Sequence, residues 1–315
     1  MRDLRIVFMG TPDFAVTILK KILEEGYNVA GVITAPDKPA GRGRKLQESA
    51  VKSFAASKGL VVLQPLNLKS PDFIEQLHAL KPNVQVVVAF RMLPKIVWRL
   101  PEYGTFNLHA SLLPQYRGAA PINWAIMNGE ELTGVSTFFI DEKIDTGEII
   151  LKKEVSIGEK ENAGDLHDKL MNEGANLVVK TLDLIKGDKV ATIKQTKVGS
   201  LKEAPKLTRD NTRIDWSAPV EKIYNHIRGL NPYPAAWSEL KNGKEVLSIQ
   251  IFKVNIKRED HDFENGMILL ENKNLKVAAK GGFINIEEIK LPGKRKMKVS
   301  DLLNGYKLEA HAKLV

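Results

Sequence analysis

Short apolar runs alternate with segments of helical periodicity through the first third of the chain, and this alternation limits the fold more than any other feature. Residues 4–10, 27–33 and 84–89 have the composition of buried strands, whereas residues 14–23 carry apolar side chains at helical spacing. Strands joined by crossover helices predict an α/β fold with a doubly wound, mostly parallel sheet, in which the run 84–89 is a central strand. The first strand ends in Gly-Thr-Pro-Asp and lacks the Gly-x-Gly-x-x-Gly turn, which argues against a nicotinamide-dependent dehydrogenase.

Other segments of this first part also carry structural signals. Helical patterns cover residues 47–58 and 163–185, and a further helix is predicted at 70–80 with Ser70 as its capping residue. The run 35–45 contains two prolines, two glycines and four cations. We expect it to be a basic loop without regular structure.

A polar stretch near the middle of the chain places candidate catalytic side chains at the ends of two predicted strands. Asn107 and His109 are two residues apart on the strand-like run 105–109, so their side chains should share one face. A second run, 134–140, leads into a turn that contains Asp145. His can carry a proton, Asp can orient or accept one, and Asn can donate to an oxygen that gains negative charge. The three form a site only if the two strands are neighbours, which their sequence spacing does not establish.

The absence of cysteine removes several kinds of chemistry. It excludes disulfides, a thiolate nucleophile and a Cys-based zinc site. The chain begins with a strand rather than a signal-peptide pattern, and its apolar runs fall short of the roughly 20 residues of a membrane helix. We therefore expect a cytoplasmic protein that spans no membrane.

The net charge of +9 is unevenly distributed. Residues 1–189 contain 24 Lys and Arg against 23 Asp and Glu, whereas residues 190–315 contain 23 against 15. A basic second part beside a neutral first part indicates an anionic partner, with nucleic acid the leading candidate. Charge that serves only solubility is the alternative.

The sequence predicts two domains and a linker. The first domain covers residues 1–189, the polar and weakly patterned linker covers 190–205, and the second domain covers 206–315. Short strand-like runs in the second domain predict a small β-barrel. These runs are residues 246–255, 266–270, 275–279 and 283–290.

A long combined motif resembles a known family of enzymes. It consists of Asn107-Leu108-His109, then Ser-Leu-Leu-Pro-x-Tyr-Arg-Gly at residues 111–118, then residues 141–147. Together these segments are similar to the core of the formyltransferases that use 10-formyltetrahydrofolate, and within that family to those that act on methionyl-tRNA. The resemblance implies a Rossmann-like formyltransferase domain followed by a smaller, basic OB-like β-barrel domain that contacts tRNA.

The resemblance also implies a reaction. A formyl group would pass from N10 of 10-formyltetrahydrofolate, a co-substrate, to the α-amino group of methionyl initiator tRNA, for translation initiation. The implied catalytic residues are Asn107, which donates to the formyl oxygen, His109, which adds positive charge, and Asp145, which orients His109 and helps to move the amine proton. No metal is implied, and we expect a monomer without an obligatory protein partner.

The folate pocket of this family lies at the end of the central strand and in the loop after His109. The residues that the resemblance assigns to it here are Arg91, Met92, Leu93, Ser111, Leu112, Leu113, Pro114 and Asp141.

Two basic segments are the implied tRNA contacts. One is the loop after the second strand, and the other is the densest cationic cluster of the second domain. Their residues are Lys38, Arg42, Arg44, Lys45, Lys294, Arg295, Lys296 and Lys298. One departure concerns the catalytic turn: Lys143 stands where relatives often have Gly, and it would be strained if the backbone there required a positive φ.

Other functions remain open from the sequence. A related formyltransferase acting on a nucleotide-linked amino sugar can share both domains. A glycinamide ribonucleotide enzyme is disfavoured, because that type usually ends after the first domain. A different class is a non-catalytic RNA-binding protein on a former enzyme scaffold, although the intact Asn107, His109 and Asp145 count against it.

Overall fold

The computed structural model describes residues 1–40, 45–196 and 199–315. Its contacts group the chain into two compact units, each interrupted in sequence. Two short segments of the predicted first domain pack with the second unit, so these units do not correspond to continuous domains. The predicted domain limits at 189 and 206 therefore stay a prediction. Unit 1 comprises Met1–Gly118, Thr133–Val155 and His167–Glu203, and unit 2 comprises Ala119–Leu132, Ser156–Leu166 and Ala204–Val315.

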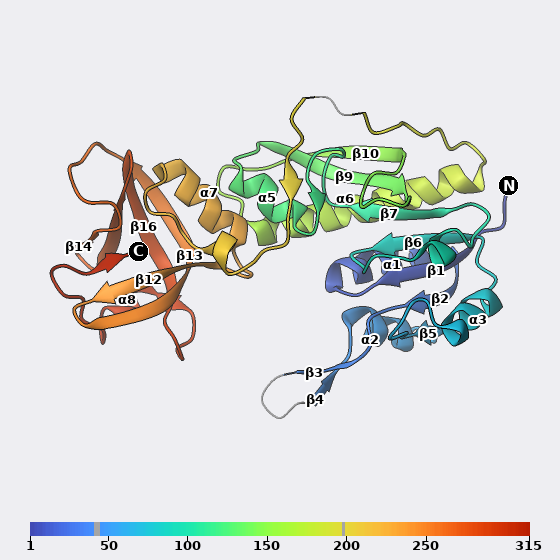
Figure 1. Cartoon of the computed structure of the whole chain (residues 1–315), viewed down its shortest axis with the longest axis horizontal. Helices are drawn as coiled ribbons and strands as arrows, with labels where there is room; N and C mark the ends of the chain where they lie inside the picture. Colours follow the sequence, from blue (N-terminus) through green and yellow to red (C-terminus); the bar gives the residue numbers. More distant parts are fainter. Residues whose placement is uncertain (41–44, 197–198) are drawn as a thin grey trace. The chain divides into compact units, whose positions relative to one another are not determined.

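Unit 1 is built on a seven-stranded sheet, whose strands are coloured blue to green in Figure 1. β1 pairs in parallel with β2 and β6, β2 with β5, and β6 with β7, whereas β9 is antiparallel to β7. β6 is the middle strand, so the predicted central strand and mostly parallel sheet are confirmed. The order is β10 (Ile149–Ser156), β9 (Leu132–Phe139), β7 (Thr105–His109), β6 (Val84–Val88), β1 (Arg5–Gly10), β2 (Asn28–Ile33) and β5 (Val62–Leu63).

One face of this sheet is covered by α3 (Pro71–Ala79) and α4 (Lys95–Trp98). Alternate residues of the central strands contribute to a buried apolar cluster, because side chains two apart on a strand point the same way. The helices fill the cluster from the other side. Its members include Val7, Met9, Ile33 and Val87 from the strands and Phe73, Leu77 and Val97 from the helices.

The opposite face is covered by α1 (Asp13–Glu24) and α6 (Ala163–Lys186). A Cβ added at Gly174 of α6 would lie 2.7 Å from a methyl carbon of Leu108 in β7, so glycine permits this close approach. The rings of Phe14 and His167 join α1 to α6 edge to face, with centroids 5.2 Å apart. Helices on both faces make the sheet doubly wound, as predicted.

Two local predictions for unit 1 are wrong. The basic segment was expected to lack regular structure, but β3 (Lys38–Ala40) and β4 (Lys45–Gln47) pair antiparallel and delay the start of α2 to Ala50–Ser57. Ser70 stands at the N-cap position of α3 without capping it, because its hydroxyl donates backwards to the carbonyl of Asn67 at 3.0 Å.

Unit 2 contains an antiparallel sheet that curls on itself (orange to red in Figure 1). The edge strand β18 (Lys313–Leu314) is bonded to the segment before β14, with Leu314 N donating to Gly266 O at 2.8 Å. The predicted small β-barrel is therefore confirmed. Its strands run in the order β14 (Ile268–Glu271), β15 (Asn274–Ala279), β16 (Gly282–Lys290), β13 (Glu245–Arg258), β12 (Ala236–Asn242) and β18, with β17 (Met297–Lys298) beside β16.

Helices complete unit 2. α7 (Val220–Leu230) packs its apolar side chains on the core of the barrel. A Cβ at Gly229 of α7 would lie 2.6 Å from the Cγ atom of Met127 in α5 (Pro121–Met127), so these two helices touch closely. Short elements complete the unit, namely the 3-10 helix η1 (Asp210–Thr212) and α8 (Val299–Leu302).

Candidate active site and basic surface

The two strands that carry the candidate catalytic residues are neighbours. β7 pairs antiparallel with β9, which places Asn107 opposite Phe138 and His109 opposite Ser136. Asn107 also lies beside Val87 of β6, whose side chain belongs to the cluster under α3 and α4. Asn107 and His109 therefore share one face, as predicted, at the carboxyl end of the parallel strands, where sites of this fold class lie.

His109 lies between a backbone carbonyl and a carboxylate. Its imidazole is buried at 7% exposure. Nε2 lies 2.8 Å from the carbonyl oxygen of Tyr116, which only accepts, so Nε2 carries a proton. Nδ1 faces the carboxylate of Asp145, with 3.8 Å between Nδ1 and Oδ2. This distance is too long for a hydrogen bond but short enough for a charge interaction in a buried place.

Asp145 occupies a tight turn after β9. Its φ of +53° is left-handed, an unusual conformation for a residue other than glycine. Its Oδ2 atom accepts a hydrogen bond from the backbone N–H of Gly118 at 3.0 Å. Two residues on, a Cβ at Gly147 would lie 1.7 Å from the carbonyl oxygen of Phe139, so the turn admits only glycine there.

Asp141 has a structural role at the start of this turn. Its Oδ1 atom accepts from the amide of Lys143 at 3.0 Å and from the hydroxyl of Thr146 at 2.7 Å. These bonds are typical of an Asx turn. The left-handed φ of the turn falls on Asp145 and not on Lys143, so the strain considered for Lys143 does not arise.

Gln195 completes the site, and it was missed in the sequence because it lies in the predicted linker. Its amide nitrogen donates to Asp145 O at 3.0 Å and to Gly147 O at 2.8 Å. Its oxygen accepts from Arg117 Nε at 3.2 Å and from Nη2 at 2.6 Å. A single Gln in a segment rich in Lys and Thr gave no signal in the sequence.

The predicted folate residues fall into an exposed and a buried group. Met92 is 67% exposed, and Arg91 extends to the carbonyls of Pro65 and Leu66. Leu93 is buried in the cluster under α3 and α4. All three follow the carboxyl end of β6, beside the end of β7 that carries His109.

The loop after His109 is tightly bonded to its surroundings. Ser111 is fully buried and donates to Gln115 O at 2.6 Å. Leu113 packs against Phe138 and Ile149, and its amide donates to the hydroxyl of Ser136 at 3.1 Å. Ser111 and Leu113 therefore shape the loop, whereas Leu112 and Pro114 are half-buried.

The predicted tRNA residues whose side chains the structure describes are exposed on each unit. Lys38 is exposed on β3, whereas Arg42, Arg44 and the side chain of Lys45 lie outside the described residues. In unit 2, Lys294, Arg295 and Lys298 are exposed around the turn between β16 and β17. Lys296 pairs with Glu288 at 2.9 Å and lies 5.3 Å from the centre of the Phe252 ring.

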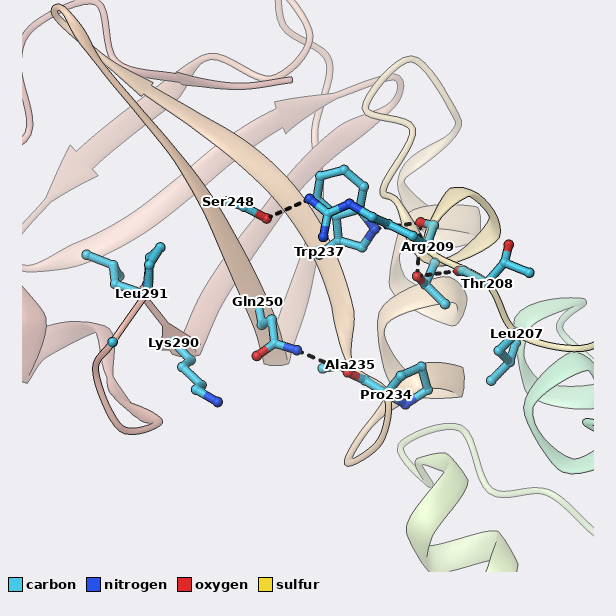
Figure 2. A pocket seen from close by; sticks show the side chains of 13 residues that line it. Leu207, Thr208, Arg209, Pro234, Ala235, Trp237, Ser248, Gln250, Lys290 and Leu291 are labelled. Atoms are coloured by element: carbon cyan, nitrogen blue, oxygen red, sulfur yellow. Dashed lines mark hydrogen bonds between the residues drawn. The ribbon is translucent and has the colours of Figure 1, made fainter. Parts of the chain in front are cut away.

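A pocket of about 570 Å³ lies in unit 2 next to this basic turn. Trp237 forms its aromatic wall, and Figure 2 shows the Arg209 side chain against that indole ring. The Arg209 guanidinium carbon lies 4.0 Å from the ring centre, and that of Arg213 lies 5.4 Å from it. Arg213 pairs with Glu239 at 3.4 Å, but neither Arg209 nor Lys290 pairs with a described carboxylate. Arg209 and Lys290 thus give the pocket positive charge that sequence reasoning did not assign.

The described part of the chain contains neither a candidate metal cluster nor a candidate membrane helix. No group of three or more His, Asp or Glu side chains there could hold a metal ion. Within the same residues, no helix is both long and apolar enough to cross a membrane.

The chain belongs to the formyl transferase family. The family model named Formyl transferase matches residues 4–182, and the model named Formyl transferase, C-terminal domain, matches residues 206–307. These two matches cover both parts of the chain on either side of residues 183–205.

Curated relatives match over nearly the whole chain. A methionyl-tRNA formyltransferase of Flavobacterium johnsoniae is 54% identical over 314 residues, covering 100% of each protein. One of Bacteroides fragilis is 51% identical over 311 residues, covering 97% of this chain and 96% of the relative.

Solved structures share the fold at low identity. An N-formyltransferase from Helicobacter canadensis, in complex with folinic acid and dTDP-3-aminofucose, has a TM-score of 0.65 at 21% identity and covers 93% of this chain and 100% of its own. HypX from Aquifex aeolicus with tetrahydrofolic acid has a TM-score of 0.66 at 16% identity. The match covers 98% of this chain but spans only 49% of HypX.

Proposed function

We propose that this protein transfers a formyl group from 10-formyltetrahydrofolate to the α-amino group of methionyl initiator tRNA. The observation that carries the proposal is the gathering of Asn107, His109 and Asp145 at one edge of the sheet. The names of relatives more than 50% identical over nearly the full chain support the choice of tRNA as acceptor.

The acceptor amine needs little activation. A free α-amine has a pKa of about 7.7–8.0, and the neighbouring ester lowers it further, so much of the nucleophile is neutral near pH 7. The enzyme must position the amine and stabilise the negative charge that grows on the formyl oxygen. Asn107 suits the second task, because its half-buried amide forms no hydrogen bond with any residue the structure describes.

His109 and Asp145 would supply charge and a route for the proton. The carbonyl of Tyr116 fixes the imidazole, and the Asp145 carboxylate faces its Nδ1 atom. The carboxylate can also take the amine proton and pass it towards the departing N10 atom, through a water molecule if the distance requires one.

The folate donor would bind at the edge formed by the ends of β6 and β7. Residues 90–94 and 111–114 follow these two strands, and Met92 leaves apolar surface exposed there. Leu93 and Leu113 are buried, so they would contribute backbone groups rather than side chains. Folate compounds in the structures of fold relatives support a folate-derived donor.

We propose that two basic surfaces contact tRNA phosphates. The first is the β3–β4 segment with Lys38, Arg42, Arg44 and Lys45. The second lies in unit 2, where Lys294, Arg295, Lys296 and Lys298 adjoin the pocket that Arg209 and Trp237 line. Phosphate contacts of this kind give affinity and make it depend on salt.

The test is a formyl-transfer assay with 10-formyltetrahydrofolate and three acceptors: methionyl initiator tRNA, glycinamide ribonucleotide and a nucleotide-linked amino sugar. We expect transfer to the tRNA alone. Transfer to a small acceptor instead would keep the reaction but discard the tRNA substrate. Failure with all three, with tRNA still bound, would indicate the non-catalytic RNA-binding protein.

A further inference from the structure

The side chain of Gln195 connects two parts of the active site. Its amide nitrogen bonds the carbonyls of Asp145 and Gly147, which flank Thr146 in the catalytic turn. Its oxygen receives two bonds from the guanidinium of Arg117. Both the nitrogen and the oxygen of this amide are therefore hydrogen-bonded, and together they connect the turn to Arg117.

The turn that Gln195 holds needs outside support. Asp145 has a φ of +53°, a left-handed conformation that is uncommon for a residue with a Cβ and that neighbouring bonds help to hold. Gly147 is fixed by the close approach of Phe139 O. The Gln195 amide bonds the backbone carbonyls at both ends of the Asp145–Gly147 segment and so fixes the orientation of this segment. The direction in which the Asp145 carboxylate points depends on that orientation.

The run of residues 116–118 connects the same groups from the other side. The Tyr116 carbonyl accepts from His109 Nε2, and the Gly118 amide donates to the Asp145 carboxylate. Arg117 lies between them and reaches Gln195. Each of these three consecutive residues therefore contacts a different member of the set His109, Asp145 and Gln195.

We propose that Gln195 is a positioning residue for formyl transfer, which fixes the Asp145 carboxylate opposite His109 by bonding the turn to Arg117. The inference rests on the proposed function, because it assigns Gln195 a role through Asp145. The Gln195 side chain bonds Arg117 and two backbone carbonyls, so it acts through Asp145 rather than on the reacting groups. Its effect is on turnover, since a displaced catalytic group loses rate even when both substrates still bind.

The chain supplies a matched control in Gln115. Its side chain also bonds the 190–205 segment, with Oε1 accepting from Lys202 N at 2.8 Å and Nε2 reaching Ser200 O at 3.5 Å. Among the described residues, the Gln115 side chain forms no hydrogen bond with the Asp145 turn. If Gln195 only fastened this segment to unit 1, loss of either glutamine would have similar consequences.

The experiment measures kcat and KM for both substrates in Gln195→Ala, Gln115→Ala and the wild type, on whichever acceptor the wild type formylates. We expect Gln195→Ala to lower kcat about 10- to 100-fold with little change in either KM. Gln115→Ala should stay within about twofold of the wild type. Gln195→Glu gives a second test if Gln195→Ala does not fold, because it keeps the acceptor for Arg117 but loses the donor to the turn.

A double-mutant cycle separates positioning from simple stabilisation. If Gln195 acts through Asp145, adding Gln195→Ala to Asp145→Asn should cause almost no further loss of kcat. Multiplicative losses, or equal effects of the two glutamine variants, would overturn the positioning role while leaving the proposed function in place. A wild type that formylates none of the three acceptors would overturn both.

Discussion

His109 Nδ1 lies 3.8 Å from Asp145 Oδ2, and the same carboxylate oxygen is bonded to the backbone of Gly118 at 3.0 Å. The carboxylate is therefore fixed by the main chain rather than by the imidazole. The carboxylate can therefore interact with His109 or accept a proton while the hydrogen bond from Gly118 still holds it in place.

The first prediction concerns the charge of Asp145. Asn tolerates the left-handed backbone and keeps an oxygen for the Gly118 amide, so Asp145→Asn removes the charge with little disturbance of the turn. We expect kcat to fall on the order of 10²–10⁴-fold, the range of a lost acid–base group, while folate binding stays measurable. Wild-type turnover in this variant, with an unchanged melting temperature, would exclude Asp145 from the reaction.

The second prediction concerns the donor at Asn107. Asn107→Ala should reduce turnover on the order of 10²–10³-fold, the cost of a lost donor to a developing oxyanion. Single-turnover measurements at saturating tRNA isolate this step. Asn107→Asp is the control for shape, since it has the same size but no amide donor. Recovery of the rate in Asn107→Asp would show that donation is not what Asn107 provides.

The third prediction compares the two arginines over Trp237. Arg209→Ala should weaken tRNA binding and reduce the dependence of log Kd on log salt by about one unit, because one phosphate contact is lost. Arg213→Ala should have a smaller effect, since Glu239 already pairs with Arg213. The measurement is a salt titration of tRNA affinity. Equal slopes for Arg209→Ala and the wild type would remove the pocket from the tRNA surface.

The fourth prediction concerns Arg42, in the basic β3–β4 segment of unit 1. Arg42→Ala should raise the KM for tRNA more than that for folate, because a phosphate contact carries affinity for the nucleic acid alone. The same assay with both substrates varied provides the measurement. Equal effects on the two substrates would argue against a role of this segment in tRNA binding.

The fifth prediction is a pH dependence of stability from His226 on α7. Burial lowers the pKa of His226, and its Nε2 atom has no partner among the described residues. The unfolded chain takes up a proton near pH 6.5 whereas the folded chain resists it, so stability is lost as pH falls below about 6.5. Urea unfolding at pH 7.5 and 5.5 should show a smaller loss in His226→Gln than in the wild type.

A matched control for that experiment is His311. Its side chain is exposed, so His311→Gln should leave the pH dependence of unfolding as it is in the wild type. Parallel loss of pH dependence in both variants would assign the effect to something other than burial of His226.

The sequence predicted the sheet, the barrel and the position of Asn107 and His109 on one face of a strand. Each prediction follows from the spacing of side chains over a few neighbouring residues. Residues 84–89 contain only strand-forming and apolar side chains except Gln85, and such a run is typical of a strand that is buried on both faces of a sheet. The short β3 and β4 strands were missed, because proline and glycine composition does not reveal a pairing between separated residues.

By itself, then, the sequence determined the parallel sheet, the barrel and the side chains available for chemistry, since period and residue type are local properties. Only the tertiary structure decided that β9 lies beside β7, that Asp145 is held by Gly118, and that Gln195 fastens the turn. These contacts join residues 27 and 50 positions apart in the chain. Their partners are selected by the packing of whole elements, which no single segment encodes.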